Sequence, residues 1–91
     1  MIGVVHCECF LPECYSLKEK RSILQSLITR VRRLNVSITE MDHQDVWQRT
    51  SLSIACINNS RKVIEKELEH VLKMIDGSEG LECHSVQYEW L

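Results

Sequence analysis

The first eleven residues limit the fold most strongly, because they alternate between two faces without interruption. One face carries Gly3, Val5, Cys7, Cys9 and Leu11, and the other carries Ile2, Val4, His6, Glu8 and Phe10. A two-residue period is typical of a β-strand, and the proline that follows ends it. The chain therefore opens with a strand over residues 2 to 11, and apolar groups occur on both of its faces.

Two helices are predicted from their capping residues and apolar spacing. Ser16, followed three residues later by Glu19, forms a capping box before a helix over residues 17 to 34. The apolar residues of that helix recur at helical spacing: Leu17, Leu24, Leu27, Ile28, Val31 and Leu34. A second helix is predicted from residue 59 or 60 to about residue 75, where a glycine-containing segment stops it.

Three further strands complete the pattern. A β-branched run predicts a strand over residues 36 to 41, and a polar turn at residues 42 to 45 joins it to a strand over residues 46 to 57. The last strand is predicted over residues 81 to 91. This order predicts a single domain over residues 1–91 with an α+β, ferredoxin-like βαββαβ sandwich. Its four-stranded antiparallel sheet carries both helices on one face.

The composition excludes several classes of protein. The chain has 91 residues and a formal net charge of −2, so its surface as a whole does not bind polyanions. It shows no basic leader and no apolar run that would serve as a signal peptide or a membrane span. We therefore expect a cytoplasmic protein without membrane contact. Five cysteines, an odd number, are then expected to stay reduced.

The face of the sheet without helices is a candidate partner surface. Alternation places Val4, Phe10 and Trp47 on it, and such an apolar patch usually marks a contact with another chain. We expect a homodimer through the sheet, with Phe10 and Trp47 as partner-binding residues. The alternative is a monomer in which polar side chains cover this face sufficiently.

Basic residues at the start of the first helix are the candidate nucleic-acid site. Lys18, Lys20 and Arg21 follow the cap closely, and Arg49 is expected nearby in the fold. Cations beside the free N–H groups of a helix N-terminus attract phosphates. The alternative is an ordinary solvated helical face. The polar segment from Asp42 to Arg49 has two readings as well, a simple turn or a recognition loop anchored by Trp47.

Metal and catalytic chemistry are not expected. Alternation points His6 away from Cys7 and Cys9, and the chain has no Cys-x-x-Cys motif, so we predict no metal and no cofactor. Acylphosphatases share the predicted fold but use an arginine in a glycine-rich loop after the first strand. The corresponding loop here, residues 12 to 16, has neither an arginine nor a glycine. No sequence motif pairs a histidine with Cys14. We therefore expect the protein to have no enzymatic activity.

Four motifs together resemble a known family. They are Leu11-Pro12, Ser16-Leu17-Lys18-Glu19-Lys20-Arg21, Asn35-Val36-Ser37 and Gln44-Asp45-Val46-Trp47-Gln48-Arg49. In this order and spacing they resemble the YlxP-like family of small bacterial proteins, over residues 2 to about 75. The resemblance implies a ferredoxin-like fold and genes that often lie beside those for translation initiation and ribosome maturation. It implies no catalytic residues.

The expected function is a non-enzymatic binding module. We expect it to act with translation or ribosome maturation by contacting structured RNA or a ribosomal particle through Lys18, Lys20, Arg21 and Arg49. One alternative is an adaptor that binds a polypeptide through the open sheet face and the Trp47 loop. Another is a small-ligand regulatory domain, because this fold hosts such modules and does not determine function.

Overall fold

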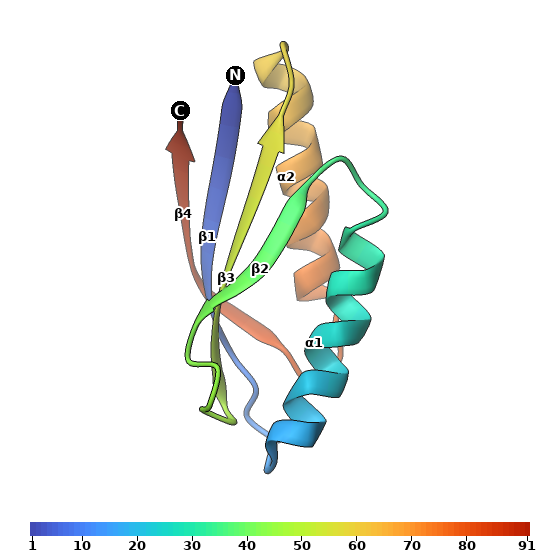
Figure 1. Ribbon diagram of the computed structural model, residues 1–91, viewed down its shortest axis with the longest axis vertical. Helices are drawn as coiled ribbons and strands as arrows, with labels where there is room; N and C mark the ends of the chain where they lie inside the picture. The colour runs from blue at the N-terminus through green and yellow to red at the C-terminus, as the bar shows by residue number, and fades with distance from the viewer.

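The computed structural model describes residues 1–91 as a sheet with two helices. The elements in chain order are β1 (Ile2–Phe10), α1 (Leu17–Val31), β2 (Ser37–Asp42), β3 (Arg49–Ile57), α2 (Arg61–Asp76) and β4 (Glu82–Trp90). The sheet is antiparallel throughout, with the strand order β2-β3-β1-β4. Both helices cover the same face of the sheet (Figure 1). The predicted ferredoxin-like βαββαβ sandwich is confirmed.

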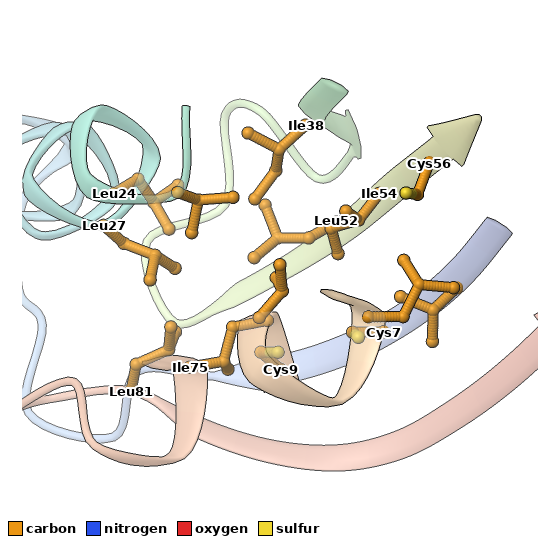
Figure 2. Packing of buried hydrophobic residues seen from close by; sticks show 14 of the residues in the cluster. Cys7, Cys9, Leu24, Leu27, Ile38, Leu52, Ile54, Cys56, Ile75 and Leu81 are labelled. Atoms are coloured by element: carbon orange, nitrogen blue, oxygen red, sulfur yellow. The ribbon is translucent and has the colours of Figure 1, made fainter. Parts of the chain in front are cut away.

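The core lies between the helices and this covered face. The side chains of Val5, Cys7, Cys9 and Leu11 are at most 1% exposed, as the strand alternation predicts. Apolar residues of β2, β3 and both helices pack against them, and Figure 2 shows part of this cluster. The second face of β1 has no helix over it, so its residues are only half-buried. The sheet therefore has one dry face and one open face.

The two helices begin where the capping residues predict. The Ser16 hydroxyl accepts a hydrogen bond from the Glu19 backbone N–H at 3.1 Å, and the Glu19 carboxylate accepts one from the Tyr15 N–H at 3.1 Å. Ser60 caps α2 in the same way through the Val63 N–H. Neither helix is long and apolar enough to cross a lipid bilayer. Local hydrogen bonding thus sets both helix starts.

Two predicted boundaries differ from the structure by three residues. Helix α1 ends at Val31 rather than at residue 34, because the N–H groups of Arg33 and Leu34 bond to the carbonyls of Arg30 and Val31, three residues back. Strand β3 begins at Arg49 rather than at residue 46. The three residues before it belong to the loop between β2 and β3, which a lysine of α1 contacts.

Gly3 sets how closely α2 approaches the sheet. A Cβ atom at this position would lie 2.5 Å from the Ile64 side chain and 2.9 Å from the Trp90 ring. Only a glycine allows this close contact. Helix α2 therefore packs directly over β1 and covers Cys7 and Cys9, whose side chains point into the core in Figure 2.

Burial of the thiols links the stability of the fold to pH. Burial raises the pKa of Cys7 from 9.0 to about 12, and burial also raises the pKa of Cys9 and of Cys56. In the unfolded chain these thiols ionise near their ordinary value, whereas in the folded chain they keep their protons. A group with a raised pKa contributes stability that is complete below the unfolded pKa and is lost above it.

We expect the free energy of unfolding to fall as the pH rises above about 9. The loss is at most about 1.4 kcal/mol per pH unit for each thiol that keeps its proton only in the folded chain. Urea denaturation between neutral pH and about pH 10 measures it. The variant Cys7→Ala/Cys9→Ala is the control and should show a shallower dependence. An equally steep dependence in this variant would contradict the assignment.

A candidate binding surface at the Trp47 end

Lys20 is the most unusual residue of the structure, because its charged side chain is only 1% exposed. Its ammonium lies 2.9 Å from the Glu40 carboxylate on β2 and donates hydrogen bonds to the carbonyls of His43 and Val46, at 2.5 and 2.6 Å. The Thr50 hydroxyl donates to the same carboxylate at 2.6 Å. A buried charge is tolerated only when it is paired and fully hydrogen-bonded. The Glu40 carboxylate and the two carbonyls meet that condition for the Lys20 ammonium.

The Lys20 ammonium determines the path of the loop between β2 and β3. The carbonyls of His43 and Val46 point to the ammonium, and the His43 carbonyl also accepts a hydrogen bond from the Val46 N–H at 3.0 Å. Neither carbonyl joins the strand ladder, and β3 starts only at Arg49. His43 adopts a left-handed backbone conformation, with φ of 64°, and its N–H donates to the Asp42 carboxylate at 2.7 Å. Strands β2 and β3 therefore form the expected hairpin, but with a longer loop.

This loop and the start of α1 together form an exposed hollow. Its lining includes Tyr15, which precedes the helix, and Trp47, which belongs to the loop. The Tyr15 side chain is 66% exposed and that of Trp47 is 48% exposed. Both segments lie at the lower end of the molecule in Figure 1. We call the surface formed by Tyr15, Trp47, Lys18 and Arg21 the Trp47 end.

The predicted basic residues are only partly brought together. Lys18 and Arg21 are exposed and line a shallow groove on α1 that reaches Glu40 on β2. Lys20 points into the protein between them, and its ammonium is occupied by internal partners. Arg49 lies opposite Phe10 in the sheet, and Phe10 belongs to the open face. Two of the four predicted cations, Lys18 and Arg21, therefore share one accessible surface.

Phe10 and Trp47 also occupy different surroundings. The Arg49 guanidinium lies over the Phe10 ring, 5.7 Å from its centroid, and the His84 ring meets the same ring edge-on at 4.6 Å. Trp47 lies in the loop between β2 and β3, where it lines a hollow together with Tyr15, and not on a strand of the open face. The predicted pair of partner-binding residues is thus divided between two surfaces.

The middle of the open face is polar. His6 makes hydrogen bonds to the Ser53 hydroxyl at 2.8 Å and to the Glu89 carboxylate at 3.0 Å. The Ser51 hydroxyl donates to the Glu8 carboxylate at 2.6 Å. These side chains bond to one another across three strands. Apolar contact with a partner is therefore available only at the two ends of the face.

Sequence reasoning missed the role of Lys20, although a signal for it was present. Residues 20, 24, 27 and 31 follow the four-three-four spacing of one helical face, so Lys20 continues the buried stripe of α1 by one turn. Glu40 likewise follows Ile38 at the two-residue spacing of the buried face of β2. Lys20 and Glu40 thus carry opposite charges at inward-facing positions, and this combination indicates a buried ion pair.

The fold is that of a small ferredoxin-like α+β domain. The chain belongs to the family described as "Protein of unknown function (DUF503)", which matches residues 2–88. It is 47% identical over 91 residues to a Bacillus subtilis (strain 168) protein described as "Uncharacterized protein YlxP", with 99% of each chain covered. The resemblance inferred from the four motifs is confirmed.

Solved structures of similar shape bear on the fold alone. The "De novo designed protein Foldit4" matches with a TM-score of 0.64 and 15% identity, over 100% of this chain and 99% of that one. A C-terminal segment of the alpha subunit of aIF2 from Pyrococcus abyssi matches with a TM-score of 0.57 and 13% identity. That match covers 96% of this chain and 49% of the other.

Replacing Lys20 should destabilise the protein strongly. Lys20→Met keeps the apolar stem but leaves the partly buried Glu40 carboxylate without its opposite charge and the Val46 carbonyl without a donor. We therefore expect a loss of about 3–5 kcal/mol in the free energy of unfolding. Urea denaturation followed by circular dichroism measures it. Lys18→Met, on the same helix but exposed, is the control and should change stability by less than about 0.5 kcal/mol. Equal effects of the two substitutions would overturn the assignment.

Proposed function

We propose that this protein is a non-enzymatic module that binds RNA at the Trp47 end. Unpaired bases stack on Tyr15 and Trp47, and the adjacent phosphates contact Lys18 and Arg21. The observation that supports this most is that two exposed aromatic side chains from separate segments line one hollow, and that two exposed cations follow Tyr15 within the first two turns of α1. Aromatic stacking combined with backbone cations is the usual basis of single-strand recognition.

The distribution of charge favours one orientation of the RNA. Asp45 lines the same hollow as Trp47 and repels phosphate, whereas the two cations lie along α1. The sugar-phosphate chain therefore follows α1, and the bases turn toward the loop. The net charge of −2 makes the attraction local rather than a property of the whole surface.

The buried Lys20 contributes by keeping the site rigid. It fixes the carbonyl of Val46, the residue directly before Trp47, so the indole is held near Tyr15 before any RNA arrives. A binding surface that is ordered in advance loses less conformational entropy on binding. Lys20 is thus a positioning residue in this proposal and not a phosphate contact.

A ribosomal particle in the cytoplasm is the partner class that this proposal favours. Ribosomal RNA presents many unpaired loops on a structured scaffold, which is the form of RNA that proteins recognise by stacking and edge contacts. The gene neighbourhood implied by the family resemblance, with translation initiation and ribosome maturation, points to the same machinery.

Charge removal at the site should weaken RNA binding and reduce its salt dependence. The probe is a short fluorescein-labelled single strand, compared with a hairpin that carries an unpaired loop. For Lys18→Ala/Arg21→Ala we expect at least about a tenfold loss of affinity, and the slope of log K against log salt should shrink by about 1.4. Trp47→Ala should also lower affinity, by about 1–3 kcal/mol. Fluorescence anisotropy measures each value.

The matched control is Arg32→Ala/Arg33→Ala. It removes the same charge from the far end of α1, where both side chains are exposed. This variant should keep its affinity and salt slope nearly unchanged. Equal losses in the two double variants would show non-specific attraction, and no binding by the wild-type protein would contradict the RNA proposal. Capture of a polypeptide that depends on Trp47 but not on salt would favour the adaptor alternative.

A second proposal concerns the open face. We infer that two copies of the chain form a homodimer through it. Ile57 is 63% exposed there, and it lies opposite Ile2 in the sheet, next to the pair of Val4 and Ala55. Arg49 lies at one end of the face and Glu89 toward the other. A two-fold axis across the strands brings Arg49 of one copy toward Glu89 of the other, so the charges are complementary.

Light scattering tests this pairing. At roughly tens of micromolar protein we expect twice the mass of one chain, as a dimer with a dissociation constant near one micromolar requires. Ile57→Glu should give the mass of one chain, whereas Val63→Glu, an exposed site on α2, should not change the mass. A wild-type protein with the mass of one chain would contradict the proposal.

A further inference from the structure

Cys9 and Cys83 lie opposite each other on neighbouring strands. They are direct partners in the antiparallel pairing of β1 with β4, next to a register shift between Glu8 and Cys9. Opposite residues of antiparallel strands have Cα atoms about 4.5–5.5 Å apart. Disulfides form at Cα separations of about 4.4–6.8 Å. The backbone at these two positions therefore already has the spacing that a disulfide needs.

The two side chains also lie on the same side of the sheet. Cys9 belongs to the buried cluster, and Cys83 packs against that cluster. Burial raises the pKa of Cys9, and the nearby Cys83 raises it further. The Cys83 thiol itself donates to the backbone carbonyl of Ser85, at 3.8 Å. All five cysteines are free thiols. Cys9 and Cys83 are therefore close in space as well as in register.

Access from solvent distinguishes the two thiols. Cys9 is 1% exposed, and Cys7, Cys14 and Cys56 are at most 2% exposed. Cys83 is only half-buried, because β4 is an edge strand. The other four cysteines are buried. A small oxidant therefore reaches Cys83 first, and Cys9 is placed to react next.

We propose that Cys83 is a site of oxidative modification that closes into a disulfide with Cys9. Hydrogen peroxide, or another small peroxide, oxidises the Cys83 thiol to a sulfenic acid and is itself reduced to water. The Cys9 sulfur then attacks the Cys83 sulfur, forming the S–S bond. The hydroxyl of the sulfenic acid leaves with the Cys9 proton as a second water. The disulfide ties the edge strand β4 covalently to β1.

Cys7 is the competing partner, and the register disfavours it. Cys7 also lies close enough to Cys83 for the two thiols to interact. Cys83, however, lies directly opposite Cys9, and Cys7 is two residues away from Cys9 on β1, so Cys7 and Cys83 are diagonal neighbours. Diagonal neighbours in an antiparallel pair are about 7–8 Å apart, and disulfides do not bridge such Cα distances unless the backbone moves. Cys9 is therefore the partner that the unchanged backbone allows.

Peptide mapping of the oxidised wild-type chain tests the proposal directly. The protein is treated with a small excess of hydrogen peroxide, its remaining thiols are alkylated under denaturing conditions, and it is cut with a protease that cleaves after glutamate. Because glutamates precede Cys9 and Cys83, and Glu8 separates Cys7 from Cys9, each candidate link gives a different peptide pair. We expect residues 9–13 joined to residues 83–89, with the loss of two hydrogen atoms.

Three variants add a second readout, the mass of the intact protein after peroxide treatment. Cys9→Ala and Cys83→Ala should lose the internal disulfide, whereas Cys7→Ala, buried on the same face of the same strand, should keep it. A link between residues 1–8 and 83–89 would overturn the assignment of Cys9. Cys83 found only as sulfinic acid, or only in disulfides between chains, would overturn the internal cross-link.

Discussion

One buried charge, the ammonium of Lys20, organises the end of the molecule where the candidate site lies. It joins α1 to Glu40 on β2 and to two carbonyls of the loop between β2 and β3. The His43 carbonyl also closes a turn with the Val46 N–H. In the loop held in this way, Trp47 lines the same hollow as Tyr15. A lysine, a residue type usually found on the surface, thus shapes this surface from inside the protein.

The two faces of the sheet separate the remaining features. The covered face buries the thiols of β1 under α2, which approaches closely because Gly3 has no side chain there. The open face combines a polar centre around His6 with apolar and charged residues at its ends. The proposed RNA binding at the Trp47 end and the proposed pairing of two copies through the open face therefore involve different surfaces and are compatible in one molecule.

Most of the fold followed from the sequence, and the candidate site followed only in part. Strand alternation and the capping residues Ser16 and Ser60 act locally, so they predicted the elements and their order. The start of β3 depends on contacts with Lys20, which lies 29 residues earlier than Arg49 in the chain, and no local pattern contains that contact. The grouping of Lys18 with Arg21, and not with Arg49, likewise required the arrangement of the layers.

The most direct test of this account is the exchange of the Lys20 ammonium protons with water, observed by nitrogen-15 NMR of the lysine side chains. The other lysines are exposed, and their ammonium protons exchange too quickly to be seen at neutral pH. Lys20 is buried with three oxygen partners, so we expect one protected ammonium signal that disappears in Lys20→Met. No protected signal in the wild-type protein would contradict the account.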